Sequence, residues 1–266
     1  MLNKRVISAV LFLPVFYLFA WKLEPVYFTM LVTAMACVGQ YEFYRMAQAR
    51  GFRPMSVLGI ALGSLVVLNH YHTLFRDMGM LFPFTASILL ITMARLFSPR
   101  PVDGALEDVA FTLLGMFYVA ALFAYQVVIR LGADGRQWLV FLYFIIWASD
   151  IGAYSIGIPF GKHRLYEKVS PKKSIEGLAG ALAASAGMAL LCRVWFMPSI
   201  GMGEAVAIAL VLAVAGTVGD LVESLFKRAA GVKDSGTLIP GHGGVLDRMD
   251  SMLFAAPVLY YYLRMR

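Results

Sequence analysis

The chain has 266 residues, 60% of them hydrophobic and 15% charged, with a net charge of +7 and a mean hydropathy of +0.74. Soluble domains contain about 45–50% apolar and about 25% charged residues, and they have too little interior to bury apolar runs of this length. The basic residues lie mostly between apolar runs, without interleaved aromatic residues. Composition and charge therefore exclude an ordinary soluble domain and argue against nucleic-acid binding.

Nine apolar segments follow one another along the chain, and about 20 residues are needed to span a membrane as a helix. They cover residues 5–21, 26–46, 55–70, 78–96, 108–130, 137–156, 175–195, 204–228 and 245–264, of which the third is short. No small-residue cleavage site follows the first segment, so we expect it to be a membrane helix and not a signal peptide.

We therefore expect an all-α, polytopic integral membrane protein with about nine transmembrane helices. The sequence predicts a single transmembrane domain over residues 1–266. Within it, residues 1–135 should form a scaffold that faces lipid, and residues 136–266 should carry the catalytic helices and cytoplasmic loops.

The distribution of Lys and Arg predicts the orientation. If the N-terminus and the even-numbered loops share one side, that side holds 16 of the 23 basic residues. Because cytoplasmic loops are enriched in Lys and Arg, we expect a cytoplasmic (inner) membrane protein whose N-terminus and active site face the cytoplasm.

Four polar residues interrupt the eighth apolar segment. Asp220, Glu223, Ser224 and Lys227 are spaced by three and four positions, which places them on one face of a helix. Asp220 lies roughly 12 Å before the cytoplasmic end of this helix, at about 1.5 Å per residue. A carboxylate at the centre of a membrane helix costs about 2.5–3.5 kcal/mol. Such a group should face a metal, a wet cavity or, as the structural alternative, an ion-pair partner on a neighbouring helix.

The polar stretch that follows combines cations, glycines and carboxylates. Glycines let backbone amides approach a phosphate closely, and Lys and Arg neutralise phosphoryl charge. Asp247 and Asp250 are spaced by three positions, so both could hold Mg²⁺ together with phosphate oxygens and water. The alternative is a solvated loop followed by a capped helix.

This stretch resembles the signature of phosphatidate cytidylyltransferases, also called CDP-diacylglycerol synthases. The positions that agree are Ser224, Phe226, Lys227, Arg228, Lys233, Asp234, Gly236, Ile239, Pro240, His242, Gly243, Gly244, Asp247, Arg248 and Asp250. A second family-like segment runs from Ser170 to Gly177, with Ser174 where threonine is common, and it follows Asp150 and Tyr154 at the end of the sixth segment. The alternative for Lys172 and Lys173 is that they only set the membrane topology.

The resemblance implies that CTP and phosphatidate give CDP-diacylglycerol and pyrophosphate. It implies that Asp220 and Asp250 hold Mg²⁺ and that Asp247 holds a second cation or orients the first. Catalytic roles are then expected for Asp220, Lys227, Arg228, Asp247 and Asp250. Substrate-binding roles are expected for Asp150, Lys172, Lys173, Ser224, Lys233, Asp234, His242, Gly243, Gly244 and Arg248.

Three alternatives belong to other reactions or classes of protein. A polyprenol kinase or an ether-lipid cytidylyltransferase would also use CTP on a lipid. A cation-coupled transporter would use Asp150 and Asp220 as ion sites, but it should contain two repeated halves with broken helices, and no such repeat is visible. The expected partners are CTP, phosphatidate and membrane lipid, without nucleic acid, and a homodimer is left open.

Overall fold

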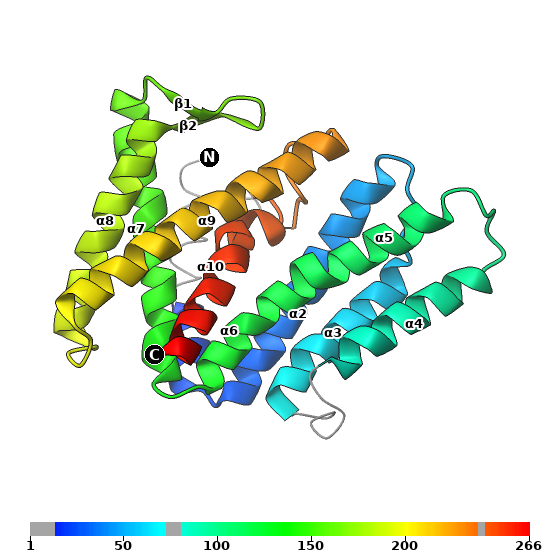
Figure 1. Ribbon diagram of the computed structural model, residues 1–266, viewed down its shortest axis with the longest axis horizontal. Helices are drawn as coiled ribbons and strands as arrows, with labels where there is room; N and C mark the ends of the chain where they lie inside the picture. Colours follow the sequence, from blue (N-terminus) through cyan, green and yellow to red (C-terminus); the bar gives the residue numbers. More distant parts are fainter. Residues whose placement is uncertain (1–13, 73–80, 239–242) are drawn as a thin grey trace. The chain divides into compact units, whose positions relative to one another are not determined.

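The computed structural model describes residues 14–72, 81–238 and 243–266, and these are almost entirely helical (Figure 1). The first predicted helix lies largely outside the described residues; its described end continues into the short π-helix η1 (Leu18–Lys22). The elements that follow are α2 (Pro25–Gln48), α3 (Ser56–His72), α4 (Phe82–Leu96), α5 (Ala105–Gly115), η3 (Met116–Ala121), α6 (Leu122–Leu131), α7 (Gly135–Phe160), β1 (Arg164–Tyr166), β2 (Ser170–Ser174), α8 (Ile175–Trp195), α9 (Met202–Ala230) and α10 (Leu246–Met265).

The apolar segments fold as the helices of a membrane protein. Within the described residues, four helices are long and apolar enough to cross a membrane: Ala105–Leu131, which joins α5, η3 and α6, and then α7, α8 and α9. Shorter apolar helices cover Ser56–Tyr71 and Phe82–Leu96. The all-α membrane fold is thus confirmed, whereas a total of nine spans stays a prediction.

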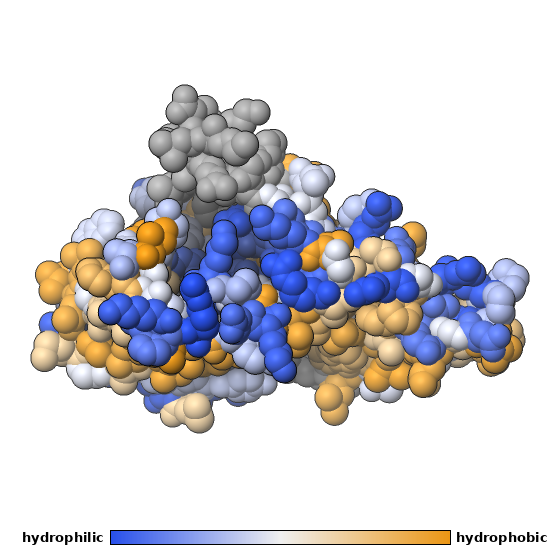
Figure 2. All heavy atoms as spheres, turned by 90° about the horizontal axis from the view of Figure 1, so that it is seen from above, coloured by the Kyte–Doolittle hydropathy of each residue, from blue (hydrophilic) through white to orange (hydrophobic). Residues whose placement is uncertain are grey.

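Large hydrophobic side chains remain exposed on these helices. Examples are Leu89 on α4, Val194 on α8 and Val211 on α9. Hydrophobic and hydrophilic side chains lie next to one another on the face shown in Figure 2. In water such surfaces would promote association, but lipid accepts them because the helical backbone is hydrogen-bonded internally.

The chain forms two compact units. The first unit contains residues 1–131 and 229–248, and the second contains residues 132–228 and 249–266. The first boundary lies close to the predicted one at residue 135. The signature segment 229–248 belongs to the same unit as the N-terminal helices. The division into a lipid-facing scaffold over residues 1–135 and a catalytic part over residues 136–266 stays a prediction.

In the first unit, α2 packs against α3, η3 and α6. Tyr44 of α2 is fully buried, and its hydroxyl donates a hydrogen bond of 2.8 Å to the carbonyl of Thr112. A Cβ atom at Gly59 or Gly115 would collide with the Tyr44 ring, so both glycines make room for it. Buried Arg95 pairs with buried Asp108 at 3.1 Å, which satisfies both charges.

In the second unit, α7 and α8 pack side by side through small residues. A Cβ atom at Gly152 would collide with the backbone carbonyl of Gly180. The helices α9 and α10 also approach closely, because a Cβ atom at Gly219 would lie 2.6 Å from the carbonyl oxygen of Asp250. These glycine contacts hold the backbones that carry Asp220 and Asp250 next to each other.

The polar connection after α7 contains the two strands, which were not predicted from the sequence. Strands β1 and β2 pair antiparallel, with Arg164 opposite Ser174. The hairpin is tied to α8, since Glu176 accepts hydrogen bonds from the backbone of Lys162 at 3.1 Å and from His163 Nδ1 at 2.6 Å. The side chain of Ser174 caps α8 by accepting the amide of Gly177 at 3.1 Å.

Candidate active site

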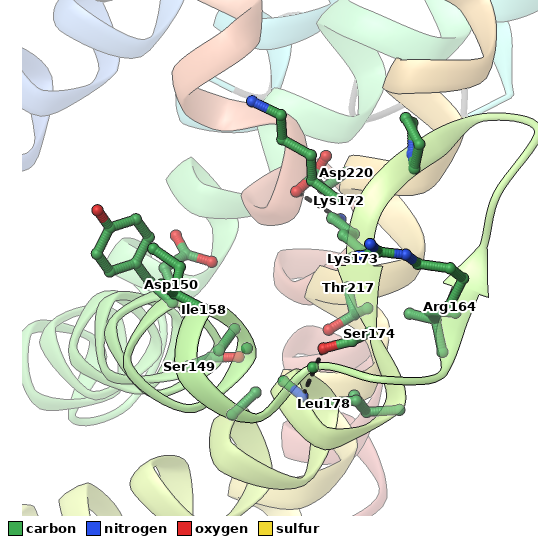
Figure 3. A pocket seen from close by; sticks show the side chains of 18 of the residues that line it. Ser149, Asp150, Ile158, Arg164, Lys172, Lys173, Ser174, Leu178, Thr217 and Asp220 are labelled. Atoms are coloured by element: carbon green, nitrogen blue, oxygen red, sulfur yellow. Dashed lines mark hydrogen bonds and ion pairs between the residues drawn. The ribbon is translucent and has the colours of Figure 1, made fainter.

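A cavity of about 690 Å³ lies in the second unit (Figure 3). It is lined by the end of α7, the hairpin, the first turns of α8, and residues of α9 and α10. The polar and charged residues of its lining are Ser149, Asp150, Tyr154, Arg164, Lys172, Lys173, Ser174, Thr217, Asp220 and Ser251. Its volume is in the usual range for small-molecule sites, about 300–1,000 Å³.

An ion pair joins the hairpin to α9 in this cavity. Lys173 Nζ lies 2.6 Å from Asp220 Oδ2, and both side chains are partly exposed. Lys172, next to it in β2, is exposed and lines the same cavity, as does exposed Asp150 of α7. The structure therefore brings Lys172 and Lys173 of the second family-like segment to the same cavity as Asp220, which lies four residues before the signature begins.

The polar face of α9 forms as its spacing predicts. Ser224 Oγ donates to Asp220 Oδ1 at 3.3 Å, and Lys227 makes an ion pair with the fully buried carboxylate of Glu223. Arg228 follows at the end of this face, and its Nε reaches the carbonyl oxygen of Val169 in the hairpin at 3.4 Å. Together with the ion pair of Lys173 and Asp220, this contact links α9 to the hairpin at two points.

Asp250 of α10 completes a group of acidic residues. The charges of Asp220, Glu223 and Asp150 all act on it electrostatically. Like charges at short range repel one another strongly where water is scarce, so such a group requires cations. Lys173 and Lys227 supply two of them.

The side chains in this group that could hold a metal are carboxylates, which donate oxygen ligands. Among the described parts of the chain, no three His, Cys, Asp or Glu side chains are close enough to form a metal site by themselves. Mg²⁺ usually takes only one or two carboxylates and completes its shell with water and substrate phosphates. Asp220 and Asp250 fit that requirement.

The signature loop lies in the first unit, where Asp247 organises it. Asp247 Oδ2 accepts hydrogen bonds from Ser235 N at 2.9 Å, Ser235 Oγ at 2.9 Å and Gly244 N at 2.8 Å. Gly243 has a φ of 83°, a left-handed conformation that glycine adopts without strain. These three donors hold Asp247 in the loop, and the expected second cation at Asp247 stays a prediction.

The other predicted loop residues are exposed or lie outside the described residues. Lys233, Asp234 and Arg248 are exposed. His242 falls outside the described residues, as do Ile239 and Pro240. The expected role of His242 in a phosphate-binding turn therefore stays a prediction.

Glu42 of α2 also belongs to the signature loop's surroundings, although its place in the sequence did not indicate this. The residue is 4% exposed, and its carboxylate accepts hydrogen bonds from the amides of Val245 at 3.0 Å and Leu246 at 2.8 Å. It also accepts one from Ser235 Oγ at 3.3 Å. The one signal in the sequence was a carboxylate within an apolar helix, and nothing near it in sequence indicated its partner.

The sequence was compared with known proteins. The cytidylyltransferase family matches residues 3–266. A phosphatidate cytidylyltransferase from Bacillus subtilis is 34% identical over 266 residues, which covers 98% of this chain and 97% of the relative. One from Synechocystis is 32% identical over 295 residues, covering 98% and 96%. One from Staphylococcus saprophyticus is 41% identical over 152 residues, covering 57% and 58%.

Proposed function

We propose, since the chain belongs to the cytidylyltransferase family, that it transfers the cytidylyl group of CTP to phosphatidate and forms CDP-diacylglycerol and pyrophosphate. The structural observation that carries this proposal is the cavity in which Lys173 meets Asp220. Family membership favours this reaction over polyprenol phosphorylation and over cation transport.

The reaction needs little covalent help from the protein. A phosphate oxygen of phosphatidate attacks the α-phosphorus of CTP, and the bond from that phosphorus to the bridging oxygen of the β-phosphate breaks. Pyrophosphate leaves with the bonding electrons. Because the lipid phosphate is itself the nucleophile, catalysis depends on positioning and on neutralising phosphate charge.

We propose that Asp220 and Asp250 hold Mg²⁺. Both are hard oxygen donors, which this ion prefers, and their acidic surroundings call for added positive charge. When bound, the ion would supply charge neutralisation to the phosphates of CTP. Asp150 at the edge of the same cavity is proposed to bind substrate.

The cations of the second unit are proposed to bind phosphates. Lys172 and Lys173 line the cavity and are proposed to meet the lipid headgroup or the nucleotide. Lys227 and Arg228 are proposed to stabilise the developing pyrophosphate, and Ser224 to bind a phosphate oxygen. Contacts with other protein groups restrain four of these residues before substrate binds: Lys173, Lys227, Arg228 and Ser224.

The loop residues of the first unit are proposed to bind phosphate as well. Lys233 and Arg248 would provide charge, and Gly243 and Gly244 would allow close backbone approach. Asp234 and His242 complete the proposed set, as their place in the signature suggests.

We further propose an inner-membrane location with the site open to the cytoplasm. The acyl chains of phosphatidate remain in lipid, whereas CTP is dissolved in the cytosol, so the cavity must be reached from both. A lateral opening at headgroup level among α7, α8 and α9 would meet this requirement.

The test is a transfer assay on the purified chain in detergent with phosphatidate, Mg²⁺ and CTP labelled at the α-phosphate. We expect the label in the lipid product and stoichiometric release of pyrophosphate. A polyprenol kinase would leave the α-label in CDP, and a preference for an ether-linked phosphatidate analogue would indicate the ether-lipid enzyme. Either result would overturn the proposal.

A further inference from the structure

Glu42 lies outside the signature and far from it in sequence, yet its side chain ends inside the signature loop. We infer that Glu42 is a positioning residue, which holds the loop and the start of α10 in the conformation that binds CTP. Glu42, Ser235 and Asp247 together are called the loop anchor below. The role in CTP binding rests on the proposed function, whereas the anchor itself rests on the contacts described here.

The start of α10 receives hydrogen bonds from a carboxylate that is distant in sequence. The first amides of a helix have no partner within the helix, and a side chain just before the helix commonly accepts one of them. Val245, which directly precedes α10, has an apolar side chain that cannot accept a hydrogen bond. The carboxylate of Glu42 accepts the amides of Val245 and Leu246 instead, and a negative charge is favoured at this end of a helix.

The loop anchor also joins the two ends of the loop. Ser235 Oγ lies within hydrogen-bonding distance of both Glu42 Oε2 and Asp247 Oδ2. The Ser235 amide and the Gly244 amide both donate to Asp247. Residues on either side of segment 239–242 are therefore fixed to the same two carboxylates, and loss of Glu42 should loosen both.

The glycines of the signature have a physical explanation in this arrangement. A Cβ atom at Gly236 would lie 2.5 Å from Glu42 Oε1, and its three nearest neighbours would all be Glu42 atoms. A Cβ atom at Gly244 would lie 2.5 Å from both Glu42 carboxylate oxygens. A Cβ atom at Gly243 would lie 2.6 Å from Asp247 Oδ2. The two carboxylates can reach the loop backbone only because side chains are absent there.

A ligand-sized space lies beside the anchor. A cavity of about 640 Å³ in the first unit is lined by Tyr41, Glu42 and Arg45 of α2 and by Asp234 to Leu238 of the loop. Within the same unit, Lys233 and Gly243 flank the anchored residues in sequence. Displacement of the loop would therefore change both the cavity and the residues proposed to bind phosphate.

The first experiment measures the anchor directly. Hydrogen–deuterium exchange of the Val245 and Leu246 amides is compared among the intact wild type, Glu42→Gln and Glu42→Ala in detergent. We expect at least tenfold faster exchange at these amides in both variants. The matched control is Gln40→Ala on the same helix, because Gln40 is buried and donates to Gly59 O at 3.0 Å, away from the loop. Unchanged exchange in Glu42→Gln would overturn the anchor.

The second experiment separates positioning from simple stabilisation. Well below the unfolding temperature of each variant, we expect kcat/KM for CTP to fall tenfold or more in Glu42→Gln, with KM for phosphatidate within twofold of wild type. Faster amide exchange with unchanged CTP kinetics would overturn the positioning role. Wild-type protein without cytidylyl transfer would contradict the proposed function, while the exchange measurement would still decide the anchor.

A double-mutant cycle tests the contact itself. Gly236→Ala should accelerate exchange at Val245 and Leu246, because its Cβ atom displaces the Glu42 carboxylate. In a Glu42→Ala background that carboxylate is gone, so the second substitution should add less than twofold. Additive effects of the two substitutions would contradict the contact, since neighbours in one network couple and independent sites do not. Glu42→Gln serves in this cycle if Glu42→Ala does not fold.

Discussion

Lys173 in strand β2 and Asp220 in helix α9 form an ion pair of 2.6 Å inside the cavity of the second unit (Figure 3). The hairpin therefore contributes a cation to the carboxylate on which the proposed chemistry centres.

Lys173→Met should reduce kcat/KM by about 100-fold, the scale seen when one group that stabilises developing charge is removed. Steady-state transfer of labelled cytidylyl groups measures this. The matched control is Lys168→Met, because Lys168 is an exposed lysine in the turn of the same hairpin. Equal effects of the two substitutions would show that the hairpin acts only through its net charge.

Asp220→Asn and Asp250→Asn should each reduce turnover at least about 100-fold and should raise the Mg²⁺ concentration for half-maximal activity. The reason is that each substitution removes one charged oxygen donor from a hard cation. The measurement is a Mg²⁺ titration of activity, after chelation has first abolished turnover in the wild type. A Mg²⁺ titration curve identical to that of the wild type in either variant would contradict the metal assignment.

Gly219→Ala should destabilise the protein by about 1–3 kcal/mol, as overpacking commonly does. Its Cβ atom would lie 2.6 Å from the Asp250 carbonyl oxygen and 3.1 Å from Phe254 Cβ, so α9 and α10 would have to separate. Activity should fall with it, because Asp250 would move. Gly187→Ala on α8 is the control, since a Cβ atom there has nothing within 4 Å. Thermal unfolding in detergent compares the two.

Ser174→Ala should lower stability by about 1 kcal/mol, the usual effect of losing a side-chain cap. The buried Ser174 hydroxyl accepts the Gly177 amide at the start of α8. Ser174→Thr keeps a hydroxyl, so it should retain most of the stability. An alanine variant that unfolds at the wild-type temperature would show that the cap contributes nothing.

The helices could be predicted because their signal is local. A run of apolar residues favours a membrane helix whatever the rest of the chain does. The predicted segment 175–195, for example, coincides with α8. The common face of Asp220, Ser224 and Lys227 was also local, since helical spacing alone decides it. The hairpin was not predicted, because strands of three and five residues are too short for an alternating pattern to stand out.

The sequence by itself thus determined the membrane class, the helical segments, the polar face of α9 and the family to which the signature points. Only the tertiary structure decided which residues meet. The ion pair of Lys173 with Asp220 depends on how a hairpin packs against a helix. The hydrogen bond from Val245 to Glu42 joins residues 203 positions apart. Periodicity in the sequence indicates which residues are neighbours within one helix. Contacts such as these arise from the packing of different elements. The role of Glu42 could therefore be identified only in the folded protein.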